Sequence, residues 1–162
     1  MNRREFLTTL AFGATALILP KQLLAGEKRT YAMGEIITKT DAEWKKILSP
    51  EQFHVLRNEG TERPFSSVLN KEYGDGQYVC VACELALFES STKFDSGTGW
   101  PSFYQPIVGA TETRRDFKMI FPRTEYHCAR CGGHQGHVFN DGPEPTGQRW
   151  CNNGVALKFS PR

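Results

Sequence analysis

Two C-x-x-C pairs constrain this chain more than any other feature, because they can tie together segments that lie far apart in the sequence. The pairs are Cys80 with Cys83 (C-V-A-C) and Cys128 with Cys131 (C-A-R-C), and residues 84–127 separate them. Each pair can present two thiolates from one turn, and four thiolates satisfy a tetrahedral zinc ion. We therefore expect two separate hairpin corners that one structural zinc ion holds together.

Two other readings of these four cysteines stay open at this point. The pairs could form two disulfides, or one pair could be a redox-active motif of the kind that opens a helix after a strand. Gly132 and Gly133 follow the second pair directly, which argues against a helix start there. The spacing and the missing helix favour zinc.

Cys151 is left over from these pairs and is the candidate nucleophile, because cysteine chemistry runs through the thiolate. It lies close in sequence to His134 and His137, and two residues before Asn153. Arg149 would lie on the same face of a regular strand, and its positive charge would lower the pKa of the thiol. The alternative is a buried core cysteine, which is common in proteins.

The spacing of apolar and turn residues predicts a mainly β fold with two short helices at its start. Thr40 opens a capping box for the first helix, Ser49 and Pro50 open a second helix, and Gly60 ends it. Short strands are predicted at residues 77–81, 85–88, 103–108, 115–121, 125–128 and 151–159. We therefore expect antiparallel sheets with the helices at one side.

Four segments carry a resemblance to a known family. They are G-T-G-W-P-S-F at 97–103, the two C-x-x-C pairs, C-G-G-H-Q-G-H-V-F-N-D-G-P at 131–143 and R-W-C-N-N at 149–153. In this order, over about residues 36–159, the chain resembles the B-type methionine sulfoxide reductases. The resemblance implies two antiparallel sheets around the active site, sometimes called a β-tent. It also implies thiol-dependent reduction of the R epimer of methionine sulfoxide in proteins.

By position, the resemblance places zinc on the four paired cysteines and the nucleophile on Cys151. The reaction needs a thiolate that attacks sulfur, hydrogen-bond donors for the oxygen, and an apolar wall for the methyl group; its product is a cysteine sulfenic acid. The residues that the resemblance implies for the substrate pocket are Trp100, His134, His137, Asp141, Arg149 and Asn153.

We expect Trp100 to form the apolar wall, and His134, His137 and Asn153 to act as donors. Asp141 would orient or tune a histidine, and Arg149 would support the thiolate. Simpler readings also exist, because the histidines could bind zinc, Asn153 and Asp141 could each serve a turn, and Trp100 could be packing.

Thr98 departs from the pattern of many family members, which carry a second cysteine at that position to resolve the sulfenic acid as a disulfide. With the other four cysteines assigned to zinc, the chain has no spare thiol. We therefore expect the sulfenic acid to react with an external thiol, either a small molecule or a thioredoxin-like domain.

Residues 1–25 resemble a bacterial twin-arginine export signal. Arg3 and Arg4 precede an apolar run to about Leu19, and Ala25 offers a small residue for cleavage. An uncleaved anchor is the alternative, but the run is short for a membrane-spanning helix. We expect a leader at 26–39, a catalytic domain at 40–162, a periplasmic location and repair of oxidised exported proteins.

The net charge gives no reason to expect nucleic acid as a partner. The formal charge is +2, and removal of residues 1–25 would bring it near zero, so neither nucleic acid nor an anionic membrane is favoured. We expect a monomer. A zinc hydrolase would need an open coordination position, and a non-catalytic zinc module would have no use for a reactive Cys151.

Overall fold

The computed structural model describes residues 34–118 and 121–162. The predicted export signal and most of the predicted leader lie outside the described residues. In chain order the elements are α1 (Asp41–Ile47), α2 (Pro50–Asn58), η1 (Val68–Lys71), β1 (Gly76–Cys80), β2 (Ala86–Glu89), η2 (Ser90–Thr92), β3 (Lys93–Phe94), β4 (Ser102–Phe103), β5 (Thr111–Asp116), β6 (Arg123–Cys128), β7 (His134–Phe139), β8 (Arg149–Asn152), η3 (Gly154–Ala156) and β9 (Leu157–Pro161).

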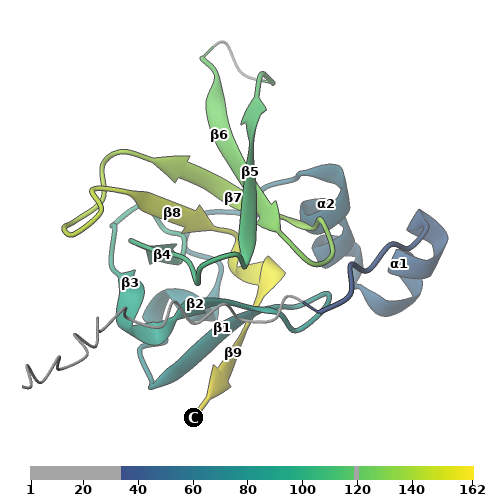
Figure 1. Cartoon of the computed structure of the whole chain (residues 1–162), viewed down its shortest axis with the longest axis horizontal. Helices are drawn as coiled ribbons and strands as arrows, with labels where there is room; N and C mark the ends of the chain where they lie inside the picture. The colour runs from purple at the N-terminus through teal and green to yellow at the C-terminus, as the bar shows by residue number, and fades with distance from the viewer. Residues whose placement is uncertain (1–33, 119–120) are drawn as a thin grey trace, which may run out of the picture.

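The strands form two antiparallel sheets, as the sequence predicts. The small sheet has the order β2-β1-β9, and the large sheet has the order β3-β4-β8-β7-β6-β5. Figure 1 shows the small sheet below the large one, with the β5–β6 hairpin of the large sheet extending upward. The mainly β architecture with two short helices at one side is confirmed.

Both helices begin at capping boxes, because a side chain satisfies backbone N–H groups that have no partner within the helix. Thr40 caps α1 together with Glu43, and Ser49 caps α2 together with Gln52. Helix α2 then packs against β7 and η3. It ends at Asn58, and its C-cap residue Glu59 has a φ of 54°, so the left-handed cap lies one residue before the predicted Gly60. Within the described residues, no helix is long and apolar enough to cross a membrane.

The hydrophobic core lies between the two sheets and is rich in aromatic rings. Phe88 of the small sheet stacks on Phe103 of the large sheet with centroids 4.1 Å apart, and Tyr78 meets Phe103 edge-on at 4.9 Å. Tyr126 packs edge-on against Trp150 at 4.9 Å. Such pairs add stability beyond the burial of their apolar area, and they fix how one sheet sits on the other.

Three predicted strands differ from the structure. The strand predicted at 103–108 is only Ser102–Phe103, and the strand predicted at 115–121 lies earlier, at Thr111–Asp116. The strand predicted at 151–159 is divided between the two sheets, because the amides of Gly154 and Val155 donate to the Glu62 carboxylate at 2.7 and 2.8 Å. This contact lies 92 residues away in sequence, so local alternation of apolar residues could not predict it.

Candidate active site and metal centre

The register of the large sheet brings the chemically active side chains into one row. Ser102 pairs with Cys151, Cys151 with His137, His137 with Glu125, and Glu125 with Arg114. Directly paired residues of antiparallel strands project to the same face. The predicted nucleophile and one predicted histidine therefore lie side by side, together with a carboxylate and a hydroxyl that the sequence did not single out.

The environment of Cys151 corrects the expected pKa of its thiol. Burial raises the pKa, and the Arg149 charge and hydrogen bonds from Thr98 and Arg149 oppose that rise without cancelling it. The proximity of Arg149 to Cys151 is thus as expected, whereas a pKa below the ordinary value is not found. The free enzyme holds a mostly protonated thiol at neutral pH, with two groups placed to stabilise the thiolate once it forms.

Asp141 binds Arg149 and not a histidine, which corrects its expected role. Its carboxylate accepts two hydrogen bonds from the guanidinium, from Nε at 2.8 Å and from Nη2 at 2.9 Å. The guanidinium also lies over the Phe139 ring, 4.3 Å from its centroid. Such bidentate and stacked contacts fix a planar guanidinium in orientation. Asp141 therefore fixes the Arg149 guanidinium, which lies beside the candidate nucleophile Cys151.

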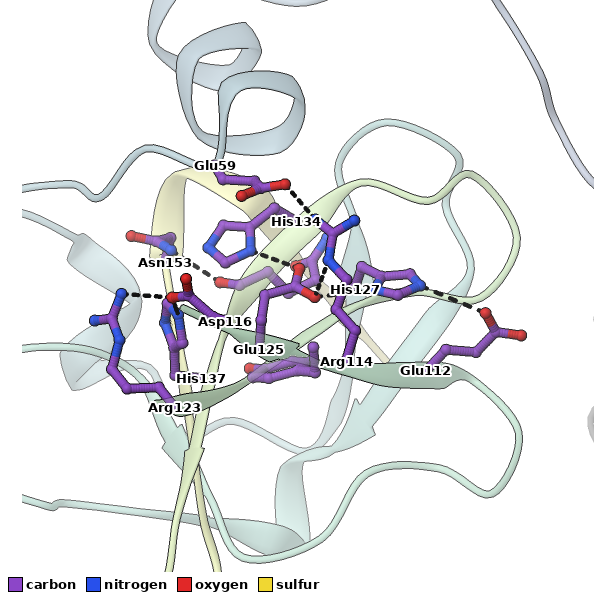
Figure 2. Close-up of polar contacts among 12 residues, drawn as sticks. Glu59, Glu112, Arg114, Asp116, Arg123, Glu125, His127, His134, His137 and Asn153 are labelled. Atoms are coloured by element: carbon purple, nitrogen blue, oxygen red, sulfur yellow. Dashed lines mark hydrogen bonds and ion pairs between the residues drawn. The ribbon is translucent and has the colours of Figure 1, made fainter. Parts of the chain in front are cut away.

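The two predicted histidines lie together, with ring centroids 5.4 Å apart. Nδ1 of His134 hydrogen-bonds Oε1 of Glu125 at 2.7 Å, and Nε2 of His137 hydrogen-bonds Oδ2 of Asp116 at 2.8 Å. Figure 2 shows both contacts, with Glu125 supplied by β6 and Asp116 by β5. Each histidine therefore has its own orienting acid, and neither acid was predicted from the sequence.

The two carboxylates are held as anions by further cations. Glu125 is 1% exposed and also accepts from Arg114 Nε at 3.0 Å. Burial raises its pKa, but hydrogen bonds from His127 and His134 prevail and lower it to about 2. Asp116 accepts from Arg123 at 2.7 Å. Burial lowers the pKa of His137, and the hydrogen bond to Asp116 works against that shift.

One loop residue, Glu62, holds both Trp100 and Asn153. The Glu62 carbonyl accepts from Trp100 Nε1 at 3.2 Å, and the Glu62 amide donates to Asn153 Oδ1 at 3.0 Å. Asn153 Nδ2 donates to the Gln135 carbonyl at 2.9 Å. Asn153 thus has a structural role in positioning the chain after Cys151, while its role as a donor to substrate stays a prediction.

The loop before Trp100 contains a short chain of hydroxyl groups. Ser96 bonds Thr98 at 2.8 Å and Ser102 at 2.8 Å, and Ser102 donates to the Trp100 carbonyl at 3.1 Å. Gly99 has a φ of 92°, and a Cβ there would come within 2.8 Å of the Phe65 amide. Glycine is therefore needed for this close approach, and Thr98 is held beside Cys151.

The two C-x-x-C pairs form two turns of the same design. The amide of Glu84 donates to the Cys80 carbonyl, and the amide of Gly132 donates to the Cys128 carbonyl, both at 2.8 Å. Glu84 and Gly132 both have positive φ, 59° and 66°. Neither turn opens a helix, in agreement with the expectation from the glycines. Each turn therefore presents its two thiols to one side.

The four paired thiols converge on a single point. Their sulfur atoms all lie within 4.8 Å of one another, with Cys80 to Cys131 at 3.7 Å and Cys83 to Cys128 at 3.5 Å. Zinc–sulfur bonds of about 2.3 Å in a tetrahedron give sulfur separations of about 3.8 Å. The cluster therefore fits a structural zinc ion, and all five cysteines of the chain are free of disulfides. No histidine is needed to complete it.

A buried polar chain joins this metal centre to the segment that carries Cys151, the candidate nucleophile. Gln135 Nε2 donates to the Cys80 sulfur at 3.4 Å, and Gln135 Oε1 accepts from Asn152 Nδ2 at 3.3 Å. Asn152 Oδ1 accepts from the Tyr126 hydroxyl at 2.6 Å. All three of these polar residues are 0% exposed. Gln135 was not predicted, because only the fold shows which way its amide points.

A groove that Glu62 helps to line contains none of the candidate reacting side chains. It lies between α2, the loop at residues 61–69 and β9, and neither Cys151 nor either active-site histidine lines it. The candidate site is therefore defined by the row on the large sheet and not by the groove.

Comparison with known proteins agrees with this geometry. The SelR domain family matches residues 48–161. The peptide methionine sulfoxide reductase MsrB of Leptospira interrogans is 52% identical over 124 residues, which cover 76% of this chain and 95% of that protein. The MsrB of Methanosarcina barkeri is 53% identical, over 76% of this chain and 87% of its own length.

A relative from Arabidopsis thaliana is also similar over most of the chain. Peptide methionine sulfoxide reductase B1, chloroplastic, of Arabidopsis thaliana is 49% identical over 142 residues, which cover 87% of this chain and 68% of that protein. Since the SelR match spans more than half of the chain and these relatives are about half identical to it, the protein belongs to the SelR-domain family of B-type methionine sulfoxide reductases.

Proposed function

We propose that the protein reduces the R epimer of methionine sulfoxide in proteins to methionine, with Cys151 as the nucleophile. The observation that carries the proposal is the row on the large sheet. It sets the Cys151 thiol directly opposite His137 and beside an Arg149 that Asp141 holds in place. The names of the relatives support the substrate class.

The reaction follows from these positions. The Cys151 thiolate attacks the substrate sulfur while a proton reaches the sulfoxide oxygen, which stabilises the charge that develops there. The oxygen ends on Cys151 as a sulfenic acid, and methionine leaves. One thiol then forms a mixed disulfide and releases water, and a second thiol frees Cys151. The zinc centre is structural and takes no part in these steps.

An assay with both epimers in a peptide, with a chemical thiol as reductant, tests the activity. We expect turnover of the R epimer and none in Cys151→Ser. The matched control is Asn70→Ser, which removes an amide that contacts the Gly99 carbonyl but no reacting group. Turnover of the S epimer alone, or unchanged activity in Cys151→Ser, would show that the assignment is wrong.

We also propose that an external thiol regenerates the enzyme. Thr98 occupies the usual position of the resolving cysteine and lies beside Cys151, and the other four thiols are gathered at the metal site. One turnover without reductant should leave a sulfenic acid that dimedone traps. Peptide mapping that instead joined Cys151 to a metal-site cysteine would refute this route.

The Thr98→Cys variant is the complementary test of the regeneration route. It should form an internal disulfide with Cys151 and use a protein disulfide reductant more efficiently than the parent. Thr98→Ser is the matched control, because it keeps a hydroxyl and adds no thiol. Failure of Thr98→Cys to form that disulfide would mean that the two positions are not in reach of one another.

We infer further that the protein is exported as a folded monomer to the periplasm and repairs oxidised proteins there. The twin arginines and the apolar run of residues 1–25 support export. Replacement of Arg3 and Arg4 by Lys should retain the protein in the cytoplasm of a bacterial host. Unchanged delivery to the periplasm would refute the signal, and a dimer mass by light scattering would refute the monomer.

A further inference from the structure

A tight turn at residues 63–66 carries an aromatic side chain where the backbone favours glycine. The Arg63 carbonyl accepts from the Ser66 amide at 3.4 Å, Pro64 takes the second position, and Phe65 takes the third with a φ of 65°. This arrangement fits a type II turn, whose third position has a positive φ and usually holds glycine. A phenylalanine there carries a conformational cost. The other non-glycine residues with positive φ in the described ranges end helix α2 or close a cysteine turn, and Phe65 does neither.

The Phe65 ring gains no burial in return for this cost, since the residue is 73% exposed. Packing of the core therefore does not account for a phenylalanine at this position. Strained residues of this kind gather where a protein binds or reacts. An aromatic ring on a fixed backbone also suits binding, because it offers a large contact area and loses little conformational freedom.

The turn is anchored to the loop that carries Trp100. The Phe65 amide donates to the Gly99 carbonyl at 2.7 Å, and Trp100 Nε1 donates to the Glu62 carbonyl at 3.2 Å. A Cβ on Gly99 would come within 2.9 Å of both the Phe65 ring and the Pro64 side chain. The edge of the ring therefore lies against Gly99.

Gly99 places the ring at the rim of the candidate site. One neighbour of Gly99 is Thr98, which hydrogen-bonds the Cys151 thiol, and the other is Trp100, the expected apolar wall. Most other residues of the loop at 61–69 line the groove, whereas Phe65 does not. Phe65 therefore belongs to the rim of the site and not to the groove.

A polypeptide substrate has to cover this rim. A methionine sulfoxide side chain that reaches the half-buried Cys151 leaves its own backbone at the mouth of the site. Its sequence neighbours then lie over the rim, because residues of an extended chain are only about 3.3–3.6 Å apart. The Phe65 ring carries no charge and no hydrogen-bonding group, so an apolar or aromatic neighbour suits it best.

We propose that Phe65 is a specificity-determining residue, whose ring contacts an apolar or aromatic side chain next to the oxidised methionine of a polypeptide substrate. The inference rests on the proposed reductase activity and deepens it, because it states which oxidised sequences the enzyme prefers. The strained backbone holds the ring in place before the substrate arrives, so little ordering is needed when the contact forms.

Two peptides of equal length and charge test this contact, with dithiothreitol as the reductant. Each contains one methionine R-sulfoxide, flanked by phenylalanine in one peptide and by serine in the other. In the parent, kcat/KM should be about 5-fold or more higher for the phenylalanine-flanked peptide, mainly through a lower KM, because an aromatic pair is worth that much in affinity. In Phe65→Ala this ratio should fall to near one. A ratio of two substrates on one preparation does not depend on the fraction of the enzyme that is folded.

Ile47→Ala is the matched control. Ile47 is another exposed apolar residue, at 56%, and Figure 1 shows its helix α1 at the opposite edge of the molecule from β4 and β8. The ratio should therefore stay at the parent value. Phe65→Tyr keeps the aromatic faces of the ring and should retain the preference.

Equal kcat/KM values for the two peptides in the parent, or a ratio that Phe65→Ala leaves unchanged, would overturn the proposal. An unchanged ratio together with slower use of a thioredoxin-like reductant, or with dissociation of a dimer, would assign the ring to that partner and would equally overturn it. Binding of the same peptides to Cys151→Ser, measured by fluorescence anisotropy, does not need turnover. A preference in binding without sulfoxide reduction by the parent would therefore refute the proposed function alone.

Discussion

Replacement of Gln135 by Met should loosen the metal centre without removing any metal ligand. Met has a similar length but cannot donate to the Cys80 sulfur or accept from Asn152, so two buried hydrogen bonds are lost. The contacts of Asn153 with Gln135 use the Gln135 carbonyl and remain. The change therefore breaks the hydrogen-bonded connection between the metal centre and the segment that carries Cys151.

The magnitude follows from the contacts that are lost. Each buried hydrogen bond contributes about 0.5–1.5 kcal/mol net, so the variant should be about 2 kcal/mol less stable. Asn152 Nδ2 keeps its bond to the Asn153 carbonyl at 2.8 Å and is not left unpartnered. For a domain of this size, 2 kcal/mol corresponds to a fall in Tm of about 8 °C. Loss of an outer partner of a metal ligand also weakens metal affinity, about 10–100-fold.

Zinc competition with a chromophoric chelator and thermal unfolding at fixed zinc would measure both effects. Gln77→Met is the control, because Gln77 is a half-buried strand glutamine whose side chain donates to Glu89 at 2.9 Å and, within the part of the chain that the structure describes, does not contact the metal site. It should change the free energy of unfolding by less than about 1 kcal/mol. Unchanged zinc affinity and Tm in Gln135→Met would refute the reasoning that this amide supports the thiolate cluster.

Three further outcomes are expected. Cys131→Ser should release the metal and lower Tm; metal analysis that still finds one zinc per chain would contradict the four-thiol site. Thr98→Val should raise the pKa of the Cys151 thiol further and slow its alkylation at neutral pH, whereas Thr98→Ser should not, and identical alkylation profiles would rule out the hydroxyl contact. The pKa of Glu125 falls from 4.5 to about 2 on folding, so its stabilisation is complete above pH 4.5 and is lost as pH falls towards 2. It amounts to about 3 kcal/mol. Urea unfolding of the parent and Glu125→Gln at pH 6 and pH 3 should show their difference shrinking, and a constant difference would contradict the low pKa.

The metal centre could be predicted from sequence because its information is local. Two C-x-x-C turns with a left-handed residue after each second cysteine repeat one short-range design, and Glu84 and Gly132 occupy equivalent positions. Cys151 could be singled out as the candidate nucleophile for a similar reason, since it is the one cysteine outside the pairs; its catalytic role stays a prediction. The order of the four motifs then implied roles for the substrate-pocket residues, which the residue types and their spacing alone did not define.

The acids that orient the histidines could not be predicted, because they depend on strand register. Glu125 and Asp116 reach His134 and His137 only when β5, β6 and β7 pair with one particular offset, and β6 and β7 carry a bulge at Tyr126–His127. A shift of one residue would turn these carboxylates to the other face. The contact of Asp141 with Arg149 in place of a histidine likewise depends on how the chain folds after β7.

The division of the predicted 151–159 strand is a second case of long-range control. Local alternation is a fair guide to a strand, but it cannot show which sheet the strand joins. The amides of Gly154 and Val155 donate to the Glu62 carboxylate and so cannot donate to a neighbouring strand. The chain crosses to the small sheet at that point.

The small sheet also sets the order in which the domain can fold. Its central strand, β1, pairs with β2 nearby and with β9 far along the chain, as Tyr78 with Phe159. Pairings over such separations form slowly, because a long loop must close before they contribute stability. The zinc cluster needs the chain only as far as Cys131. During synthesis, metal capture can therefore precede closure of the small sheet, which needs β9 at the end of the chain.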